Sequence, residues 1–451
     1  MPPPVAIDTR QAGDWYRRNR ARSEAIFDLI DPAAYYSRPI ALRNPIVFYE
    51  GHLPAFSVLA FLRRGLGRLP VDARLEALFE RGIDPDTEAA AVPRSGASTA
   101  WPTRDEVRAF ARACDEAVVT AIDSGLAFDS LAPAHARAAQ EGLYTALEHE
   151  AMHQETLLYM WHRLPYDRKR GQTPFRLDQK VTSSLINNHP HSPQRRSSHP
   201  DRGQTPVGIA AGTATLGLRR DAVPFGWDNE FDSHQVHVPA FDLDALPVTN
   251  AQFLEFIAAG GYTQRALWSD DGWQWVQAER VTHPAFWVSQ PSTSDPPHPQ
   301  WHWRGMFEPI PLPADWPVYV SHAEASAYAR WKGRRLITEP EFHRAAEGTT
   351  TGHFDFAGFE PIAVGSHPPS TAGVCDLVGN GWEWTSTVFA PFDGFAPMGS
   401  YPEYSADFFD GLHFVMKGAS PATARELVRP SFRNWFRGTY PYVYAKFRTA
   451  Q

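Results

Sequence analysis

The sequence is poor in cysteine and in long apolar runs. Its 451 residues include only Cys114 and Cys375, too few for a disulfide framework and typical of a protein of the reducing cytoplasm. The longest uncharged apolar run, Leu53 to Leu62, has about half of the ~20 residues that a membrane-spanning helix needs. The N-terminus lacks the apolar core of a signal peptide. We therefore expect a cytoplasmic protein with no membrane partner.

An excess of positive charge is also absent. Lysine and arginine number 43 against 51 aspartate and glutamate residues, which gives a net charge of −8. Because no basic surplus can neutralise nucleic-acid phosphates, we expect no nucleic-acid partner. Hydrophobic residues make up 43% and charged residues 21% of the chain, as in ordinary folded proteins. Small molecules are the expected partners.

The first part of the chain has a helical pattern. Apolar residues recur at spacings of three and four, which predicts four helices over about 11–29, 46–64, 103–122 and 134–164. Thr103 and Glu106 match a capping box at the start of the third helix, and Pro54 should begin or kink the second part of another. We expect an all-α four-helix bundle over residues 1–182, a common setting for metal sites.

The remainder of the chain has a different composition. Residues 183–206 are rich in Ser, Pro, His and Arg and lack periodicity, so we interpret them as a linker or exposed loop with solvated histidines. Residues 207–451 contain short apolar runs between Gly, Pro, Asn and Asp, with only two convincing helices, over 250–259 and 322–332. This pattern predicts an α+β domain with much irregular structure.

The most informative local pattern is the segment His149-Glu150-Ala151-Met152-His153 in the last predicted helix. Histidines four residues apart lie on one helix face, about one turn apart, and can reach the same metal ion. His52 is the candidate third ligand, because a polar ring in its otherwise apolar stretch needs a partner. Glu155 is a candidate to accept a ligand's second N–H. Ligand type leaves iron(II), zinc and copper open.

Two alternatives compete with this metal site. The segment also matches the HExxH string of zinc proteases, in which Glu150 would be the general base. The longer metzincin pattern fails, because Tyr159 stands where the third histidine would be, and a long bundle helix is an unusual setting for a protease. The second alternative is a histidine pair that is exposed or hydrogen-bonded and binds no metal.

Taken in order, these motifs resemble the non-heme iron sulfoxide synthases of ergothioneine biosynthesis. The N-terminal part is similar to a DinB-like bundle with an upstream histidine and a His-x3-His-x-Glu motif, matched by His52, His149, His153 and Glu155. The C-terminal part resembles the formylglycine-generating-enzyme (sulfatase-modifying factor) domain, which has a C-type-lectin-like fold. Its matching stretches are Phe225 to Glu230, Pro247 to Asn250, Ala327 to Trp331, Arg335 to Glu339 and Gly379 to Trp384.

The resemblance implies a mechanism. Three histidines would hold Fe(2+), whose open positions take the imidazole of hercynine (Nα-trimethylhistidine), the chalcogen donor and O2. A tyrosine, matched by Tyr401 with Tyr404 as its polar neighbour, would supply a proton or hydrogen. Asn434 and Trp435 match the substrate side of the family's site, where Asn434 would hold the substrate carboxylate and Trp435 would face the trimethylammonium group.

Departures from the family pattern concern the chalcogen donor. Thiol synthases carry an arginine pair where this chain has the stretch Arg94 to Thr103, which includes Trp101. They carry an Asp at the position of Phe436 and a Gln at the position of Met152. A pocket with Trp101 and Phe436 in place of charged groups predicts a neutral, sugar-like donor. This resembles the selenoneine synthase branch, so we expect C–Se bond formation with a selenosugar. An ergothioneine-type synthase that uses γ-glutamylcysteine or another thiol is the alternative.

Three other functions are compatible with parts of this pattern, and each makes its own prediction. Zinc-dependent thiol transferases also have DinB-like bundles with three histidines, but they need neither oxygen nor a C-terminal domain. Formylglycine-generating activity uses a pair of C-terminal cysteines, and this domain has only Cys375. A non-enzymatic carbohydrate- or protein-binding module would show no turnover and would not need His52.

Overall fold

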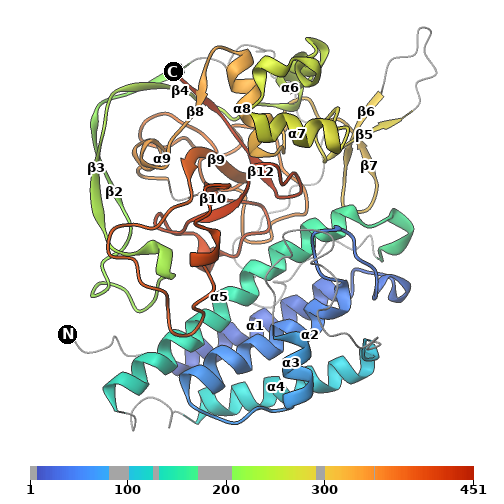
Figure 1. Ribbon diagram of the computed structural model, residues 1–451, viewed down its shortest axis with the longest axis vertical. Helices are drawn as coiled ribbons and strands as arrows, with labels where there is room; N and C mark the ends of the chain where they lie inside the picture. The colour runs from blue at the N-terminus through green and yellow to red at the C-terminus, as the bar shows by residue number, and fades with distance from the viewer. Residues whose placement is uncertain (1–7, 81–100, 125–131, 171–205, 291–299, 350) are drawn as a thin grey trace.

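The computed structural model describes residues 8–80, 101–124, 132–170, 206–290, 300–349 and 351–451. Within these residues, helices make up the N-terminal part, and small sheets with flanking helices make up the C-terminal part (Figure 1). None of the described helices is long and apolar enough to cross a membrane. Residues 183–205 of the predicted linker, and residues 94–100 before Trp101, lie outside the described residues.

The N-terminal part is a bundle of four main helices. They are α1 (Thr9–Phe27), α2 (Ile46–Ser57), α4 (Arg104–Asp123) and α5 (Pro133–Arg163), with the short α3 (Ala73–Phe79) between α2 and α4. The four predicted helices are confirmed, and Thr103 and Glu106 form the predicted capping box of α4. Pro54 lies inside α2, which continues as the π-helical segment η2 (Val58–Gly65). The sequence pattern does not predict α3, because seven residues are too few to show a helical period.

The C-terminal part contains short strands in four described sheets. One sheet has the order β1 (Pro206–Ile209), β4 (Phe241–Asp244), β13 (Thr449–Ala450) and β8 (Arg335–Leu336). A second has the order β11 (Asn434–Arg437), β10 (His413–Ala419), β9 (Gly381–Val388) and β12 (Ala445–Lys446). The other two are the pair β2 (Gly212–Leu216) and β3 (His234–Val238), and the sheet β5 (Trp287–Gln290), β6 (Gln300–Arg304) and β7 (Pro309–Pro311).

Helices flank these sheets. Both predicted helices are present as α6 (Asn250–Ala258) and α8 (His322–Trp331). The expectation of only two convincing helices is wrong, because α7 (Asp270–Ala278) and α9 (Glu339–Ala345) are also present. Both are short, and each begins with a side-chain cap, from Ser269 and Thr338 respectively, so that local capping outweighs their weak periodicity. The predicted two-domain fold class, a helical bundle followed by an α+β domain, is confirmed.

α5 and the sheet that contains β11 position the site. Figure 1 shows α5 along the boundary between the bundle and the C-terminal domain. The middle and end of α5 are buried on almost every side, as expected for a helix that packs against a domain on each face. β10 pairs antiparallel with β11 and with β9, and this register places His413 opposite Arg437 and Val415 opposite Trp435. β11 is therefore an edge strand of this sheet, and all four of its residues line a cavity beside α5.

Candidate metal centre and substrate cavity

His52, His149 and His153 lie together between α2 and α5. Their candidate ligand atoms are all within 4.8 Å of one another, and the Nε2 atoms of His149 and His153 are 3.1 Å apart. His149 and His153 come from successive turns of α5, and His52 comes from the middle of α2. The structure thus brings together the three predicted ligands, although their binding of a metal remains a proposal.

The surroundings of the three rings favour the neutral, metal-binding form. His52 Nδ1 is 2.7 Å from the carbonyl oxygen of Phe79 at the end of α3, so Nδ1 donates its hydrogen and Nε2 keeps its lone pair. Burial lowers the pKa of His52 to about 4. Burial, and then the neighbouring imidazoles, lower the pKa values of His149 and His153 well below the ordinary range. All three rings are therefore neutral at pH 7, as metal ligation requires.

Ring nitrogens of the cluster that lack a hydrogen-bond partner also fit a metal site. Among the described residues, His52 Nε2, His149 Nδ1 and His153 Nδ1 are buried without a hydrogen-bond partner. A buried polar atom without a partner is costly, and a cation would satisfy His52 Nε2. Phe48 stacks on His52 and Phe56 stacks on His149, with ring centroids 4.9 and 3.6 Å apart, so apolar rings form the surrounding wall. Three imidazoles leave coordination positions open, as a catalytic metal needs.

Glu155 does not support a ligand histidine. Residues two apart on a helix are rotated by about 200°, so Glu155 faces away from His153. Its carboxylate accepts hydrogen bonds from Trp382 Nε1 and Thr423 Oγ1 of the C-terminal domain, each at 2.7 Å. The prediction for Glu155 is therefore wrong; among the three histidines, the second N–H of His52 is accepted by the carbonyl of Phe79 instead.

Glu150 is not placed as the general base of a zinc protease. It points toward α1, where it accepts hydrogen bonds from Arg20 at 2.8 Å and from Ser23 at 2.6 Å. Burial raises the pKa of Glu150, and the guanidinium of Arg20 opposes this rise. Because Glu150 is occupied within the bundle, its geometry does not support the protease alternative.

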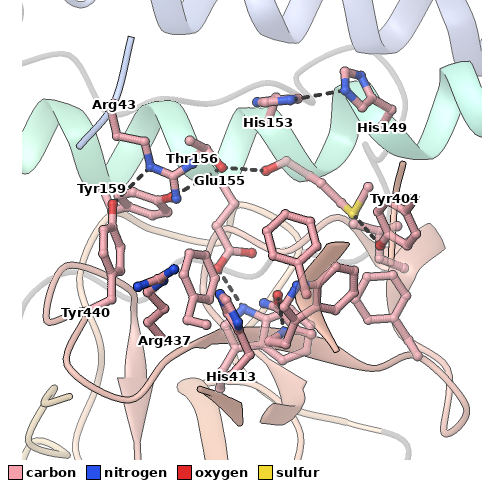
Figure 2. Close-up of a pocket in the computed structure, with 18 of the residues that line it drawn as sticks. Arg43, His149, His153, Glu155, Thr156, Tyr159, Tyr404, His413, Arg437 and Tyr440 are labelled. Carbon is pink, nitrogen blue, oxygen red and sulfur yellow. Dashed lines mark hydrogen bonds between the residues drawn. The ribbon is translucent and has the colours of Figure 1, made fainter. Parts of the chain in front are cut away.

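A cavity lies beside the histidines, between α5 and the C-terminal domain (Figure 2). Tyr401 and Tyr404 line it near His149, and the ring centroids of Tyr401 and His149 are 5.9 Å apart. The Tyr404 hydroxyl donates to the sulfur of Met152 at 3.4 Å, and its ring stacks on Trp227. Burial raises the pKa of Tyr404 well above its ordinary value, so this hydroxyl keeps its proton. Both predicted tyrosines thus lie at the end of the cavity that holds the histidines.

Of the other predicted substrate residues, four line the cavity and one, Trp101, packs in the bundle. Asn434, Trp435, Phe436 and Met152 all line the cavity. Trp101 does not line the described cavity; it packs in the bundle against Phe48 and Phe79, with ring centroids 6.4 and 6.2 Å away. The prediction of Trp101 as a donor-pocket residue is therefore wrong. An indole that comes just before α4 finds its apolar partners in the bundle core.

The end of the cavity away from Tyr404 contains the buried Arg43, which the sequence pattern does not predict as a site residue. Arg43 Nε donates to the Tyr440 hydroxyl at 2.9 Å, and Arg43 Nη2 donates to the Tyr159 hydroxyl. Figure 2 shows Arg43, Tyr159 and Tyr440 at one end of the cavity and Tyr404 at the other. The only signal in the sequence is a single arginine next to an apolar helix, which does not reveal where the guanidinium points.

A second basic group comes from β11 and β10. Arg437 lines the cavity with its side chain 40% exposed, and its guanidinium is 4.0 Å from Asp410. His413, its partner across the two strands, is 2.9 Å from the same carboxylate through Nδ1. The expectation of a donor pocket without charged groups is therefore wrong, because Arg43 and Arg437 both line the cavity. Strand register, not local sequence, places Arg437 there.

Comparisons with known proteins cover both parts of the chain. The DinB superfamily matches residues 16–157, and the sulfatase-modifying factor enzyme 1-like domain matches residues 192–451. A hercynine oxygenase of Mycolicibacterium thermoresistibile is 29% identical over 96% of this chain and 92% of that protein. A hercynine oxygenase of Mycobacterium tuberculosis is 37% identical over 52% of this chain, and the match spans 58% of that protein's length.

A fungal relative is longer than this chain. Ergothioneine biosynthesis protein 1 of Schizosaccharomyces pombe is 27% identical over 92% of this chain, which spans about half (53%) of that protein. The histidine cluster falls in the DinB match, and the tyrosines and β11 fall in the sulfatase-modifying factor match, which covers more than half of the chain. The chain therefore belongs to the sulfatase-modifying factor enzyme 1-like family, and its N-terminal part matches the DinB superfamily.

Proposed function

We propose that this chain is an iron(II)-dependent enzyme that uses O2 to join hercynine to a thiol, as an ergothioneine-type sulfoxide synthase. The observation that carries the proposal is the cluster of three neutral histidines beside a cavity lined by Tyr401 and Tyr404. Relatives that are similar along both domains are named hercynine oxygenase and ergothioneine biosynthesis protein 1. These names support hercynine as one substrate and favour a thiol over a selenosugar as the other.

In this proposal, His52, His149 and His153 hold the iron, and the Phe79 carbonyl fixes the orientation of His52. The iron, when bound, supplies open coordination positions and the redox chemistry of oxygen. In the overall reaction the imidazole carbon loses its hydrogen and the thiol loses its own, while one oxygen atom goes to sulfur and the other to water. Tyr401, whose ring contacts Phe56 and His149, would supply the proton at this end of the cavity, and Phe56, stacked on His149, would form an apolar wall beside the cluster.

A selenosugar is the second candidate donor. Phe436 and Met152 line the cavity where thiol synthases carry an Asp and a Gln, and aromatic faces suit sugar rings. Arg437 weighs against it, because its charge suits a donor that carries a carboxylate. We therefore place the thiol first.

Aerobic incubation of the iron-loaded protein with hercynine and one donor at a time tests the proposal. The donors are γ-glutamylcysteine, cysteine and a selenosugar, and mass spectrometry identifies the products. We expect a C–S product with a thiol, and none without oxygen or with the His153→Ala variant. Oxygen-independent turnover by zinc-loaded protein would support a thiol transferase instead. Hercynine that stays unchanged with every donor would contradict the proposal.

A further inference from the structure

We infer that Arg163, Lys169 and Arg304 bind a doubly charged oxyanion, such as a phosphate group, at a site outside the substrate cavity. Arg163 is the last residue of α5, Lys169 follows the short helix η3 (Tyr166–Arg168), and Arg304 is the last residue of β6. None of the three lines the described cavity. A bound anion would therefore join the bundle to the C-terminal domain, and its binding does not depend on the proposed function.

Hydrogen bonds bring the three residues together where the end of α5 meets β6. Arg163 Nη1 donates to the carbonyl oxygen of Ala285 at 2.7 Å, and the residue after Ala285 accepts from the main-chain N–H of Arg304, also at 2.7 Å. Lys169 Nζ donates to the carbonyl oxygen of Met306 at 2.5 Å, two residues beyond Arg304. The bundle thus presents two cations to the strand that carries the third. All three residues are partly exposed, so an anion from solvent can reach them.

The three positive charges repel one another. Burial, and then the guanidinium group of Arg304, lower the pKa of Lys169 to about 7, and Arg163 adds to this decrease. Burial and the charge of Arg304 also lower the pKa of Arg163. Like charges held close together in a partly dehydrated place are costly unless an anion balances them. The cluster therefore favours a ligand of opposite charge.

The described residues supply little of that opposite charge. None of the three cations forms an ion pair with a described carboxylate. Glu360 is near enough to oppose the decrease in the pKa of Lys169, but its carboxylate has other partners. It accepts hydrogen bonds from Trp303 Nε1 and the main-chain N–H of Met306, both at 2.6 Å, and lies 3.4 Å from His162. One shared carboxylate leaves an excess of positive charge in the cluster.

Two buried atoms in the cluster can donate hydrogen bonds. They are Arg304 Nε and the hydroxyl of Tyr166, and neither has an acceptor among the described residues. The ring of Tyr166 lies 4.7 Å from the Lys169 ammonium, and burial raises the pKa of its hydroxyl, which therefore keeps its proton. Lys169 and Arg163 have further N–H groups besides those bonded to backbone carbonyls. Because all of these groups can donate, an oxyanion, whose oxygens only accept, fits the cluster better than a neutral ligand.

The end of a helix does not explain the cluster by itself. Cations near the C-terminus of a helix are stabilised by its dipole, which accounts for Arg163. This effect decays within the last turn, whereas Lys169 and Arg304 lie outside α5. The convergence of cations from both domains therefore needs a further cause, which a shared anion supplies.

Calorimetric titration of the full-length protein with sodium sulfate tests the inference, with sodium chloride added to hold the ionic strength constant. We expect saturable binding with a dissociation constant on the order of 0.1 mM at pH 6.5. Arg304→Gln should weaken the affinity by about 10- to 100-fold, because it removes a charged donor from the site. The control Arg219→Gln removes an exposed arginine paired with Asp221 and should keep the affinity of the unmodified protein.

The affinity should also depend on the charge of Lys169. A bound sulfate raises the pKa of Lys169 from about 7, so its binding takes up a proton and weakens as the pH rises from 6.5 to 9. The charged or titratable groups that face this cluster are Arg163, Arg304, Tyr166, Glu360 and His283. None of them changes its charge over this range, and sulfate keeps both of its charges. Lys169→Gln should therefore bind sulfate less tightly and with an affinity that no longer changes with pH.

Other anions identify what the site accepts. Inorganic phosphate and glycerol phosphate, titrated in the same way, distinguish a free anion from a phosphate ester, and binding of either at least as tight as that of sulfate supports the site. No saturable binding of sulfate or phosphate by the unmodified protein overturns the inference, and so does an unchanged affinity in Arg304→Gln. If Arg304→Gln does not fold, Lys169→Gln takes its place, and an unchanged affinity at pH 6.5 then overturns the inference in the same way.

Discussion

The direction in which each side chain leaves α5 determines its role. His149 and His153 are one turn apart and face His52, whereas Glu150 faces α1 and Glu155 faces the C-terminal domain. One short segment therefore provides two candidate metal ligands, an ion pair inside the bundle and a contact between the domains. Substitutions at neighbouring positions should then have different effects.

His153→Ala should remove bound iron and leave the helical content unchanged, because two histidines cannot complete the site. Glu150→Gln should have the opposite effect. It breaks a buried ion pair with Arg20, which keeps Asp115 as a second partner at 2.9 Å, so we expect a loss of roughly 1–3 kcal/mol of unfolding free energy, but it leaves the metal ligands in place. Metal analysis after dialysis, circular dichroism and urea unfolding measure these effects. Full iron occupancy in His153→Ala, or loss of iron in Glu150→Gln, would show that the ligands are assigned wrongly.

Tyr401→Phe tests the proposed proton donor. The Tyr401 ring lies 4.9 Å from Phe56 and 5.9 Å from His149, so the substitution removes a hydroxyl at the histidine end without a change of shape. We expect kcat to fall by ~10²- to 10⁴-fold while the KM for hercynine stays the same. Tyr404→Phe is the matched comparison, because the Tyr404 hydroxyl donates to Met152 instead. A normal kcat in Tyr401→Phe with a low kcat in Tyr404→Phe would transfer the role to Tyr404.

At the scale of elements, α5 joins the two domains through charged and polar contacts. Arg429 of the C-terminal domain lies between two buried carboxylates, 2.8 Å from Glu148 of α5 and 2.5 Å from Glu230. Trp227 Nε1 also donates to Glu148, at 2.7 Å. The cavity wall that contains Tyr404 rests on this cluster, because the Tyr404 ring stacks on Trp227 at 3.9 Å. The orientation of the two domains should thus depend on Arg429.

Arg429→Met should leave two buried carboxylates without their cation, at a cost of roughly 3–5 kcal/mol. Without Arg429, burial raises the pKa of each carboxyl above its value in the unfolded chain. The folded variant then binds protons more tightly than the unfolded one, so its stability falls as the pH rises. Urea unfolding should show a larger loss at pH 8 than at pH 5, and Glu148→Gln in the same variant should recover part of it. A loss that does not depend on pH would contradict this account.

The elements differ in how far the sequence predicts them. The four long bundle helices and the histidine pair follow from periodicity, because each is a property of one helix. α3, α7 and α9 are too short to show a period, and they depend on caps and on packing. The partners of Glu155, Trp101 and Arg43 could not be predicted, since they belong to surfaces that meet only in the folded molecule.

At the scale of the whole molecule, the cavity belongs to both domains. The bundle contributes Arg43, His149 and Met152, and the C-terminal domain contributes Tyr401 and all of β11. Most of the residues that the family resemblance names line this cavity, whereas Trp101 does not and His52 lies behind it, next to His149 and His153. The charge of the cavity, however, depends on arginines from both sides, and this charge bears directly on the choice of donor.

Donor choice should follow the charges that line the cavity. Arg437 lies where a donor carboxylate can reach it from solvent, whereas Phe436 offers no counter-charge for an amino group. Glu155, the one acidic residue of the described lining, is already bonded to Trp382 and Thr423. We therefore expect a donor with a carboxylate to be favoured and its amino group to matter little.

Steady-state kinetics with three donors tests this expectation. Cysteine and 3-mercaptopropionate, which lacks the amino group, should have similar kcat/KM values, both higher than that of a neutral selenosugar. Arg437→Gln should lower the values for the two acids by roughly 5-fold, as for a half-exposed charge, and leave the selenosugar unaffected. Phe436→Asp should favour cysteine over 3-mercaptopropionate, because it gives the ammonium group a partner. A higher kcat/KM for the selenosugar with the unmodified protein would instead support a selenoneine-type synthase, because the aromatic wall around Phe436 would then outweigh the charge of Arg437.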